Sequence, residues 1–472
     1  MFIGKHHEIS RRAFLERTGK LAITGTAGAY ALGLSGLGEA AAFSSDGGYK
    51  ALVCVFLYGG NDHANTLIPY DPTNYQRYAN IRRDVALPRN SLASTLLIPR
   101  DNQTLTDDMA LALAPTMPRL KSRFDEGKLA VLLNVGPLEA PITRAQYESG
   151  NTKAFPRPRK LFSHNDQQAT WQSSEVEGGT TGWGGRMGDL AQSANTNAMF
   201  TAINVSGNAV FLSGNQTLPF RISSRGPVQI DAIKANSLYR SSQASEALRE
   251  VISNHHQHVF EQDYAAAMMQ SLTYSPFVSD TLLGASNVPS PIADNPLSTQ
   301  LNIVARLIEA RERMGVTRQV FFVSLGGFDH HSNLLGSHEG LLGLVDQAVD
   351  QFYQTTKRLG VAESVTTFTA SDFGRTLTPN GNGSDHGWGA HHFILGGAVD
   401  GGRFYGRAPK ISVTSDEQVG RGRLLPTISV DEYSTTLARW FGVSPSELPS
   451  IAPNIGRFAN PNLGFMRAST SQ

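Results

Sequence analysis

Short apolar runs alternate with helical patterns along the chain, and this alternation constrains the fold more than any other feature of the sequence. Most of the runs are continuous and are bounded by glycine or polar residues. Continuous apolar runs of this length are typical of strands that are buried on both faces of a sheet. The runs predicted as strands are 50–58, 128–135, 199–205, 319–325, 365–370 and 393–396.

Apolar residues at helical spacing predict helices between these runs, over 115–126, 298–314, 341–359 and 430–441. We expect Asp431 to be the N-cap of the last of these helices. Strands that alternate with helices predict an α/β fold, with a mostly parallel central sheet and helices on both of its faces. The segment 206–296 is rich in serine, asparagine and glutamine, and is interpreted as an insertion or cap over the sheet.

The N-terminal segment 1–42 has the pattern of an export signal. Arg11 and Arg12 are followed by Phe14-Leu15, then by a weakly hydrophobic, glycine-rich stretch and by three alanines before Phe43. This pattern predicts a twin-arginine signal peptide, not a stable membrane anchor, with a mature domain over 43–472. The alternative is a chance arginine pair before an apolar helix. Export implies the twin-arginine translocation machinery as a partner and a periplasmic or extracellular location.

Charge and cysteine content exclude several classes of function. The formal net charge is +1 and the basic residues are scattered, so nothing favours nucleic-acid binding. Cys54 is the single cysteine of the chain and lies within an apolar run, which favours a buried, inert thiol. A zinc site made of several cysteines is excluded, so any metal must be held by histidine and carboxylate.

Polar segments rich in aspartate and histidine follow the predicted strands. They read GGNDHANT, SHNDQQATWQ, GGFDHHSN, SDFGRT and NGNGSDHGWGAHH, and they contain seven of the 13 histidines. In open α/β sheets, sites form outside the carboxyl ends of the strands, so these segments are expected to meet. A lone aspartate after a strand is more often a turn or cap residue. The combined set nevertheless favours a metal site made of Asp62, Asp329, His331, Asp372 and His386.

The metal itself is left open by the residues. Mixed imidazole and carboxylate ligands suit zinc, manganese or iron, whereas oxygen-rich subsets suit magnesium or calcium. One or two divalent ions fit the number of candidate ligands.

Ser163 and Arg375 are the candidate catalytic residues. Ser163 follows 160–162, where we expect a strand to give way to a helix. A hydroxyl at a helix N-terminus beside divalent cations is a candidate nucleophile, but it is equally a simple N-cap. Arg375 is suited to clamp a phosphate or sulfate oxygen, or to a structural ion pair. No G-x-S-x-G elbow, phosphate-binding loop or dinucleotide fingerprint is present.

The motifs VFLYGGNDHANTLIPY, FSHNDQQATWQ, GGFDHHSN and SDFGRTLTPNGNGSDHGWGAHHFILGG occur in this order after an RRAFL signal. Together they resemble the bacterial family known as domain of unknown function 1501, over nearly the whole mature chain. That family in turn resembles the alkaline phosphatase and sulfatase superfamily. The resemblance implies Ser163 as nucleophile, one metal on Asp329, His331 and His386, and a second on Asp62 and Asp372.

Two departures from that superfamily are visible in the sequence. Its metal-dependent phosphatases usually have a histidine directly after the second aspartate, but Asp372 is followed by Phe373. Asp385, His391 or His164 would have to supply the missing ligand. Ser163 is followed by His164-Asn165-Asp166, so the modification motif of sulfatases is absent.

The expectation is therefore an exported metal-dependent hydrolase of phosphate or sulfate esters, acting on a small-molecule or glycan ester. The alternative is a non-catalytic envelope or carbohydrate-binding protein on a degenerate scaffold of the same kind, and Phe373 favours it.

Overall fold

The computed structural model describes residues 43, 48–175, 179–207, 209–227, 239–253 and 259–467 of the chain. The predicted signal over 1–42 lies outside these residues. Within them, no helix has both the length and the apolar character needed to cross a membrane.

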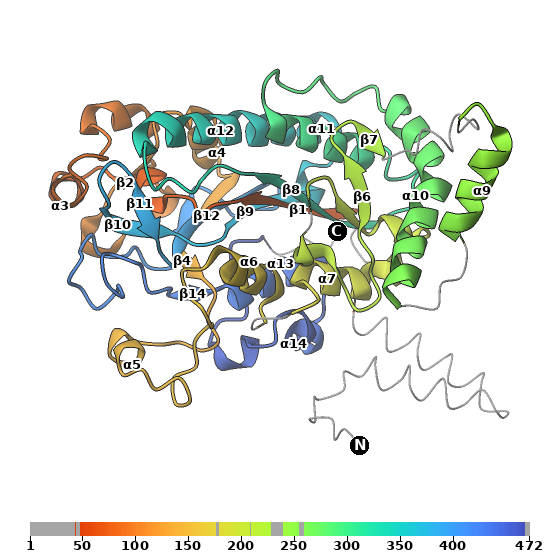
Figure 1. Cartoon of the computed structure of the whole chain (residues 1–472). Coiled ribbons are helices and arrows are strands. Elements are labelled where there is room, and N and C mark those ends of the chain that lie inside the picture. The colour runs from red at the N-terminus through yellow and green to blue at the C-terminus, as the bar shows by residue number, and fades with distance from the viewer. Residues whose placement is uncertain are drawn as a thin grey trace.

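A ten-stranded sheet forms the middle layer of the molecule (Figure 1). Its strands lie in the order β13-β4-β12-β9-β1-β8-β5-β6-β7, and β14 also pairs with β4. Strands β9, β1, β8, β5 and β6 are parallel to one another, whereas β12 and β7 are antiparallel to their neighbours. The strands are β1 (Lys50–Leu57), β4 (Leu129–Gly136), β5 (Ala202–Asn204), β6 (Phe220–Ser223), β7 (Gly226–Pro227), β8 (Arg318–Leu325), β9 (Val365–Ser371), β12 (Ala390–Gly396), β13 (Arg403–Tyr405) and β14 (Ile428–Ser429).

Helices cover both faces of this sheet (Figure 1). Strand β1 shows why: Val53 and Val55 join one apolar core, while Leu52 and Cys54 join the other. Alternate side chains of a strand point to opposite faces, so a strand that is apolar throughout needs cover on both. Helices α4 (Pro118–Asp125), α11 (Pro296–Glu309) and α12 (Leu334–Arg358) lie on one face, and α6 (His164–Ser173), α7 (Trp183–Ala191) and α13 (Val430–Phe441) on the other.

The predicted α/β architecture is therefore confirmed, with a mostly parallel sheet and helices on both faces. Cys54 is a free and fully buried thiol, and burial raises its pKa well above the usual value. The prediction of an inert cysteine agrees with this environment.

Smaller elements complete the described part of the chain. Two short sheets flank the main one: β2 (Leu67–Pro69) pairs with β3 (Leu111–Leu113), and β10 (Arg375–Pro379) pairs with β11 (Ser384–His386). The remaining α-helices are α3 (Pro72–Ile81), α5 (Arg144–Glu148), α9 (Ser242–Ser253), α10 (Val259–Gly284) and α14 (Leu448–Ile451).

The segment 206–296 continues the sheet beyond β5 with β6 and β7. Helix α10 packs against β7, α9 and α11, at the end of the molecule opposite to β10 and β11 (Figure 1). Its interpretation as an insertion stays a prediction, as does the division of the chain at residue 43.

Two local predictions are wrong. Residues 160–162 form turns and not a strand, because Lys160 and Phe162 adopt left-handed backbone angles, with φ of 47° and 73°. The N-cap of α13 is Ser429 and not Asp431. The Ser429 hydroxyl accepts the backbone N–H of Glu432, whose carboxylate accepts the backbone N–H of Ser429 in return.

Candidate metal centre

Three neighbouring parallel strands end at one edge of the sheet and are followed by acidic residues. Asp62 follows β1, Asp329 follows β8, and Asp372 follows β9 directly. The loop after β1 passes very close to the loop after β8. At Gly59, where φ is +114°, an added Cβ would lie 2.4 Å from the backbone nitrogen of Asp329. Glycine is therefore required at this crossing.

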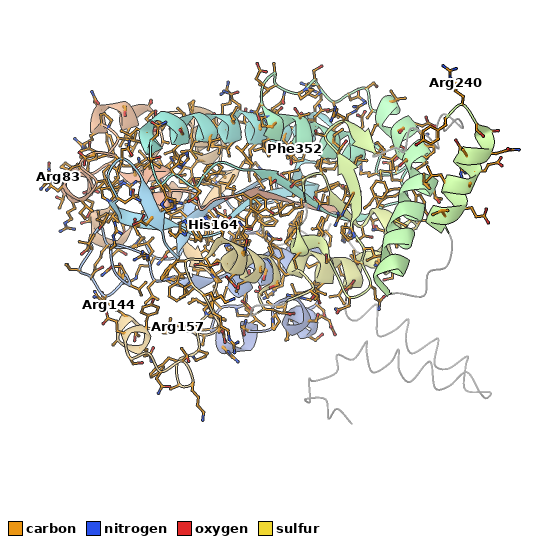
Figure 2. The ribbon with its side chains drawn as sticks, viewed as in Figure 1. Arg83, Arg144, Arg157, His164, Arg240 and Phe352 are labelled. Atoms are coloured by element: carbon orange, nitrogen blue, oxygen red, sulfur yellow. The ribbon has the colours of Figure 1, made fainter. Side chains whose placement is uncertain are left out.

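His164 is the first residue of α6, and its ring is fixed by a buried carboxylate. Its Nδ1 donates to Asp372 Oδ2 at 2.7 Å, and Gln168 Nε2 donates to the same oxygen at 2.7 Å. The other ring nitrogen, Nε2, lies 3.4 Å from Asp329 Oδ2. The hydrogen bond to Asp372 raises the pKa of His164 above its usual value. Figure 2 shows His164 near the middle of the molecule.

His386, at the end of β11, is fixed in the same way by a backbone carbonyl. Its Nδ1 donates to the carbonyl oxygen of Phe162 at 2.8 Å, and its Nε2 lies 3.2 Å from Asp329 Oδ1. Burial lowers the pKa of His386, which favours the neutral ring. His331 completes the group, with Nε2 at 2.8 Å from His386 Nε2 and 3.1 Å from Asp329 Oδ1.

Asp329 is the carboxylate on which these imidazoles converge. Burial would raise its pKa, but the hydrogen bond and charge of Arg375 hold the pKa below its usual value. Arg375 Nη1 donates to Asp329 Oδ1 at 2.8 Å and to the carbonyl oxygen of Gly59 at 3.0 Å. Its Nε donates to Ser384. The Arg375 side chain is fully buried, so it positions Asp329 and is not presented to a substrate.

The donor set fits a divalent cation. An imidazole whose Nδ1 donates a hydrogen bond keeps the lone pair of the neutral ring on Nε2. His164 and His386 therefore turn lone pairs toward a carboxylate that is itself electron-rich. A cation or an extra proton between them converts this repulsion into attraction. Ligand atoms of His164, Asp329 and His386 all lie within 4.8 Å of one another, and their outer nitrogens have the partners expected of metal-bound histidines.

Asp62 does not join this cluster. Arg82 Nη2 donates to its Oδ2 at 2.8 Å, and the Ser384 hydroxyl donates to the same oxygen at 2.7 Å. Both side chains of the Asp62–Arg82 pair are almost completely buried. Burial would raise the pKa of Asp62, but the Arg82 guanidinium holds it well below the usual range. A fixed arginine charge thus lies where the family resemblance implies a second metal.

Arg82 is the residue that the sequence did not reveal. It follows α3, it belongs to no motif, and it lies 20 positions from its partner. Arg82 and Arg83 follow the helix as an ordinary basic pair, and only the tertiary contact distinguishes the buried Arg82 from the exposed Arg83.

Phe373 occupies the other expected ligand position. It is buried, and its ring centroid lies 4.9 Å from that of His164 and 4.6 Å from that of His386. Gly60, with φ of +80°, leaves the space for this ring, since an added Cβ would lie 2.2 Å from it. Phe373 therefore supports the two imidazoles laterally and supplies no ligand.

The weaker ligand candidates lie around the cluster or away from it. Asp385 Oδ1 is 3.4 Å from His331 Nδ1 and accepts from Asn380 Nδ2 at 2.5 Å, while its other oxygen pairs with Arg421. His391 lies on β12, where its Nδ1 accepts the backbone N–H of Asn134 at 3.1 Å. Asp385 therefore lies behind His331, on the side away from Asp329, and His391 lies beside β4 and outside the cluster.

Ser163 is the residue before α6, but its hydroxyl does not cap the helix. The hydroxyl donates to Asp166 Oδ2 at 2.5 Å, and Lys160 Nζ lies 3.5 Å from the other oxygen of that carboxylate. A serine that donates to a carboxylate within a helix N-terminus has a proton acceptor at hand.

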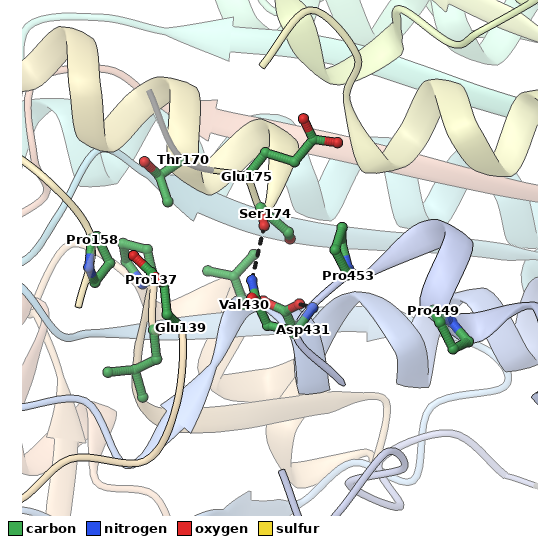
Figure 3. A pocket seen from close by; sticks show the side chains of 12 residues that line it. Pro137, Glu139, Pro158, Thr170, Ser174, Glu175, Val430, Asp431, Pro449 and Pro453 are labelled. Carbon is green, nitrogen blue, oxygen red and sulfur yellow. Dashed lines mark hydrogen bonds between the residues drawn. The ribbon is translucent and has the colours of Figure 1, made fainter. Parts of the chain in front are cut away.

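A cavity of about 510 Å³ lies on the α6 and α13 side of the sheet (Figure 3). Its lining includes Thr170, Glu175 and Asp431, and contains none of the candidate ligands. Asp431 accepts the backbone N–H of Asn454 at 2.9 Å, and burial raises its pKa to about 7. The carboxyl group predicted as a helix cap is thus a buried acid beside a cavity.

The sequence matches the family model described as "Protein of unknown function (DUF1501)" over residues 49–434, which is more than half of the chain. The chain belongs to the DUF1501 family. The family resemblance predicted from the motifs is thereby confirmed. Comparison with curated proteins found no sequence match.

Solved structures similar to this DUF1501 protein share about one residue in ten with it. The C-terminal periplasmic domain of EcEptC from Escherichia coli, in complex with Zn, has 10% identity and a TM-score of 0.33, covering 85% of each chain. The lipoteichoic acid synthase LtaP from Listeria monocytogenes has 10% identity and a TM-score of 0.31, covering 85% of this chain and 74% of its own. Ps i-CgsB in complex with k-i-k-neocarrahexaose has 10% identity and a TM-score of 0.34, covering 88% and 77%.

Proposed function

We propose that this DUF1501 protein is an exported metal-dependent hydrolase of phosphate or sulfate esters. One observation carries the proposal: two imidazoles, fixed through Nδ1 by Asp372 and by the Phe162 carbonyl, direct Nε2 at the single carboxylate of Asp329. This is the arrangement in which outer partners orient metal ligands and raise their basicity.

His164, Asp329 and His386 would hold the cation, with His331 as a fourth ligand. Three imidazoles and one carboxylate suit zinc or manganese better than calcium, which prefers oxygen ligands. The proposed site takes one cation. Arg82 already neutralises Asp62, and Phe373 supplies no ligand for a second ion.

A divalent cation bound here would act as a Lewis acid on an ester oxygen. Ser163 is the proposed nucleophile. Its oxygen would form a bond to the phosphorus or sulfur atom as the ester bond breaks, and its proton would pass to Asp166 at 2.5 Å and then to the departing alkoxide, which leaves as the alcohol. Water would then hydrolyse the seryl ester, which releases phosphate or sulfate and restores the Ser163 hydroxyl. Arg375 would act as a positioning residue that holds Asp329, and not as a clamp on the substrate.

The experiment compares metal content, stability and activity. Asp329→Asn and His386→Gln are expected to lose the bound metal measured by elemental analysis, and to lose the stabilisation that added Zn²⁺ or Mn²⁺ gives the wild type. Asp84→Asn, which changes an exposed aspartate, is the matched control. Wild-type-like metal content in both site variants would falsify the metal centre.

Activity separates the enzyme from a binding protein. Ser163→Ala is expected to lose hydrolysis of para-nitrophenyl phosphate, bis(para-nitrophenyl) phosphate or para-nitrophenyl sulfate, with metal content and melting temperature unchanged. If the metal-loaded wild type cleaves none of these esters, the second candidate gains support. That candidate is a non-catalytic envelope or carbohydrate-binding protein with a structural metal, and Phe373 and Arg82 in place of a second metal site favour it.

Export is proposed from the Arg11-Arg12 signal alone. Replacement of both arginines by lysine is expected to retain the chain in the cytoplasm, as measured by cell fractionation. An unchanged distribution between cytoplasm and periplasm would contradict twin-arginine export.

A further inference from the structure

A cavity of about 550 Å³ lies beside the candidate metal centre, and Phe162 in its lining is separated from the candidate ligand His164 by Ser163 alone. Phe162 lines this cavity, and its carbonyl oxygen is the acceptor for His386 Nδ1 at 2.8 Å. The size is within the range of small-molecule and sugar-binding pockets.

Cationic side chains dominate the lining of this cavity. Arg157, Arg159 and Lys160 line it, and Glu139 is the acidic residue among the lining residues. The carboxylate of Glu139 is already faced by Arg457, whose Nη1 lies 3.9 Å from its Oε2 and donates to its backbone carbonyl at 3.1 Å. Lys160 Nζ lies 3.5 Å from the Asp166 carboxylate, so Arg157 and Arg159 carry the positive charge that the cavity offers to an anionic group.

Aromatic rings lie beside these cations. The Arg157 guanidinium lies over the Tyr147 ring at 4.4 Å and donates to the Tyr147 carbonyl oxygen at 2.9 Å. The Arg423 guanidinium lies over the Phe162 ring at 4.8 Å and donates to the carbonyl oxygen of His386 at 2.8 Å. Tyr147 and Phe162 both line the cavity. These contacts hold the two guanidinium groups in fixed orientations, and a fixed guanidinium is suited to bidentate binding of sulfate or phosphate oxygens.

The backbone that joins the cavity to the metal centre is strained. Lys160 and Phe162 adopt φ of 47° and 73°, which residues other than glycine rarely do. Such strain is stored where surrounding contacts over-determine the backbone, and it clusters at ligand sites. Here it turns the Phe162 carbonyl toward His386 while the Phe162 ring faces the cavity.

We propose that this cavity binds a second anionic group of the substrate, so that the substrate carries more than one sulfate or phosphate ester. This inference rests on the proposed function for the position of the reacting ester. The binding of the second group depends only on the cavity, so the two proposals can fail separately.

Binding is tested with the full mature chain and three probes of one backbone: dextran sulfate, phosphorylated dextran and unmodified dextran, each measured by calorimetry. We expect binding of one or both charged probes and not of the neutral one. The double variant Arg157→Gln/Arg159→Gln is expected to weaken it about tenfold or more, and added salt to weaken the wild type more than the variant. Whichever charged dextran binds more tightly identifies the substituent.

The matched control is Arg240→Gln/Arg249→Gln, which removes two exposed cations from the region of α9. Figure 2 shows Arg240 at the end of the molecule opposite to Arg157. Equal weakening by both double variants would mean that binding follows net charge alone and would overturn the proposal, as would binding of unmodified dextran.

Hydrolysis separates this proposal from the proposed function. On a small aryl ester, the Arg157→Gln/Arg159→Gln variant is expected to retain wild-type kcat/KM, while its kcat/KM on the charged dextran falls about tenfold or more. Equal loss on both substrates, with an unchanged melting temperature, would overturn the cavity proposal. Cavity-dependent binding without any hydrolysis would instead leave it standing and contradict the proposed function.

Discussion

At the scale of single residues, Asp372 decides what His164 can do. Its Oδ2 accepts from both His164 and Gln168, and its Oδ1 is buried without a hydrogen-bond partner in the described structure. The carboxylate thus lies behind the imidazole and fixes its tautomer, while the opposite nitrogen faces Asp329. Asp372 is therefore a positioning residue in our scheme, and not the direct ligand that the family resemblance implies.

Substitution of Asp372 tests that role. Asp372→Ala is expected to weaken Zn²⁺ binding about 10- to 100-fold, as measured by calorimetry, with the same number of ions bound per chain. The pKa of His164 in the metal-free protein, measured by NMR, should fall because the carboxylate that raises it is gone. Gln168→Ala removes the other donor to Asp372 and should change both quantities little. Loss of a whole bound ion in Asp372→Ala would mean that Asp372 binds metal directly.

At the scale of elements, helix α13 contains a buried carboxyl group, Asp431, that makes the stability of the fold depend on pH. Asp431 lies in the first turn of α13 and has a folded-state pKa of about 7, against an ordinary value of 3.8. The folded state therefore holds a proton that the unfolded state releases. Stability contributed by that proton is fully present below about pH 4 and is lost as the pH rises through about 7.

Asp431→Asn is expected to remove this dependence, because asparagine accepts the Asn454 N–H without a charge. The free energy of unfolding of the variant minus that of the wild type should therefore increase by up to about 4 kcal/mol as the pH is raised from 4 to 8. Urea denaturation at both pH values measures the difference, with Asp84→Asn as an exposed control. If the free energies of unfolding of wild type and Asp431→Asn change equally with pH, Asp431 does not have a raised pKa in the folded state.

At the scale of the whole molecule, the Asp62–Arg82 pair joins segments that are far apart in the chain. Besides Asp62, Arg82 Nη1 donates to the carbonyl oxygens of Thr376 and Leu377 at 3.2 and 3.3 Å. Ser384 then links Asp62 to Arg375, and Arg375 holds Asp329. A continuous buried network thus runs from the end of α3 to the candidate metal ligand.

Removal of the arginine should be costly. Arg82→Met leaves the Asp62 carboxylate buried without its cation, and is expected to lower the free energy of unfolding by about 3–5 kcal/mol. Arg467→Met breaks a pair with Glu363 in which both side chains are exposed, and should cost at most about 1 kcal/mol. Denaturant unfolding measures both. Equal small losses would show that Asp62 does not depend on Arg82.

The sequence by itself determined the architecture, and it predicted the segments from which the candidate cluster is drawn. Continuous apolar runs that alternate with helical patterns need a covered parallel sheet, and such a sheet gathers the polar ends of β1, β8 and β9 at one edge. Asp329 and His331 lie at this edge for this reason, because they follow β8. His164 and His386 reach the same edge from the start of α6 and the end of β11, which the apolar pattern does not predict.

Only the tertiary structure decided the role of each residue. The partner of a carboxylate depends on contacts between distant segments, which no spacing encodes: Asp62 pairs with Arg82, Asp372 with His164, and Asp329 with Arg375. The backbone of Lys160 and Phe162 is likewise held in a left-handed conformation that their side chains do not favour. The reason is physical: burial makes an unpaired charge so costly that the nearest partner in space, and not in sequence, determines what each acid can do.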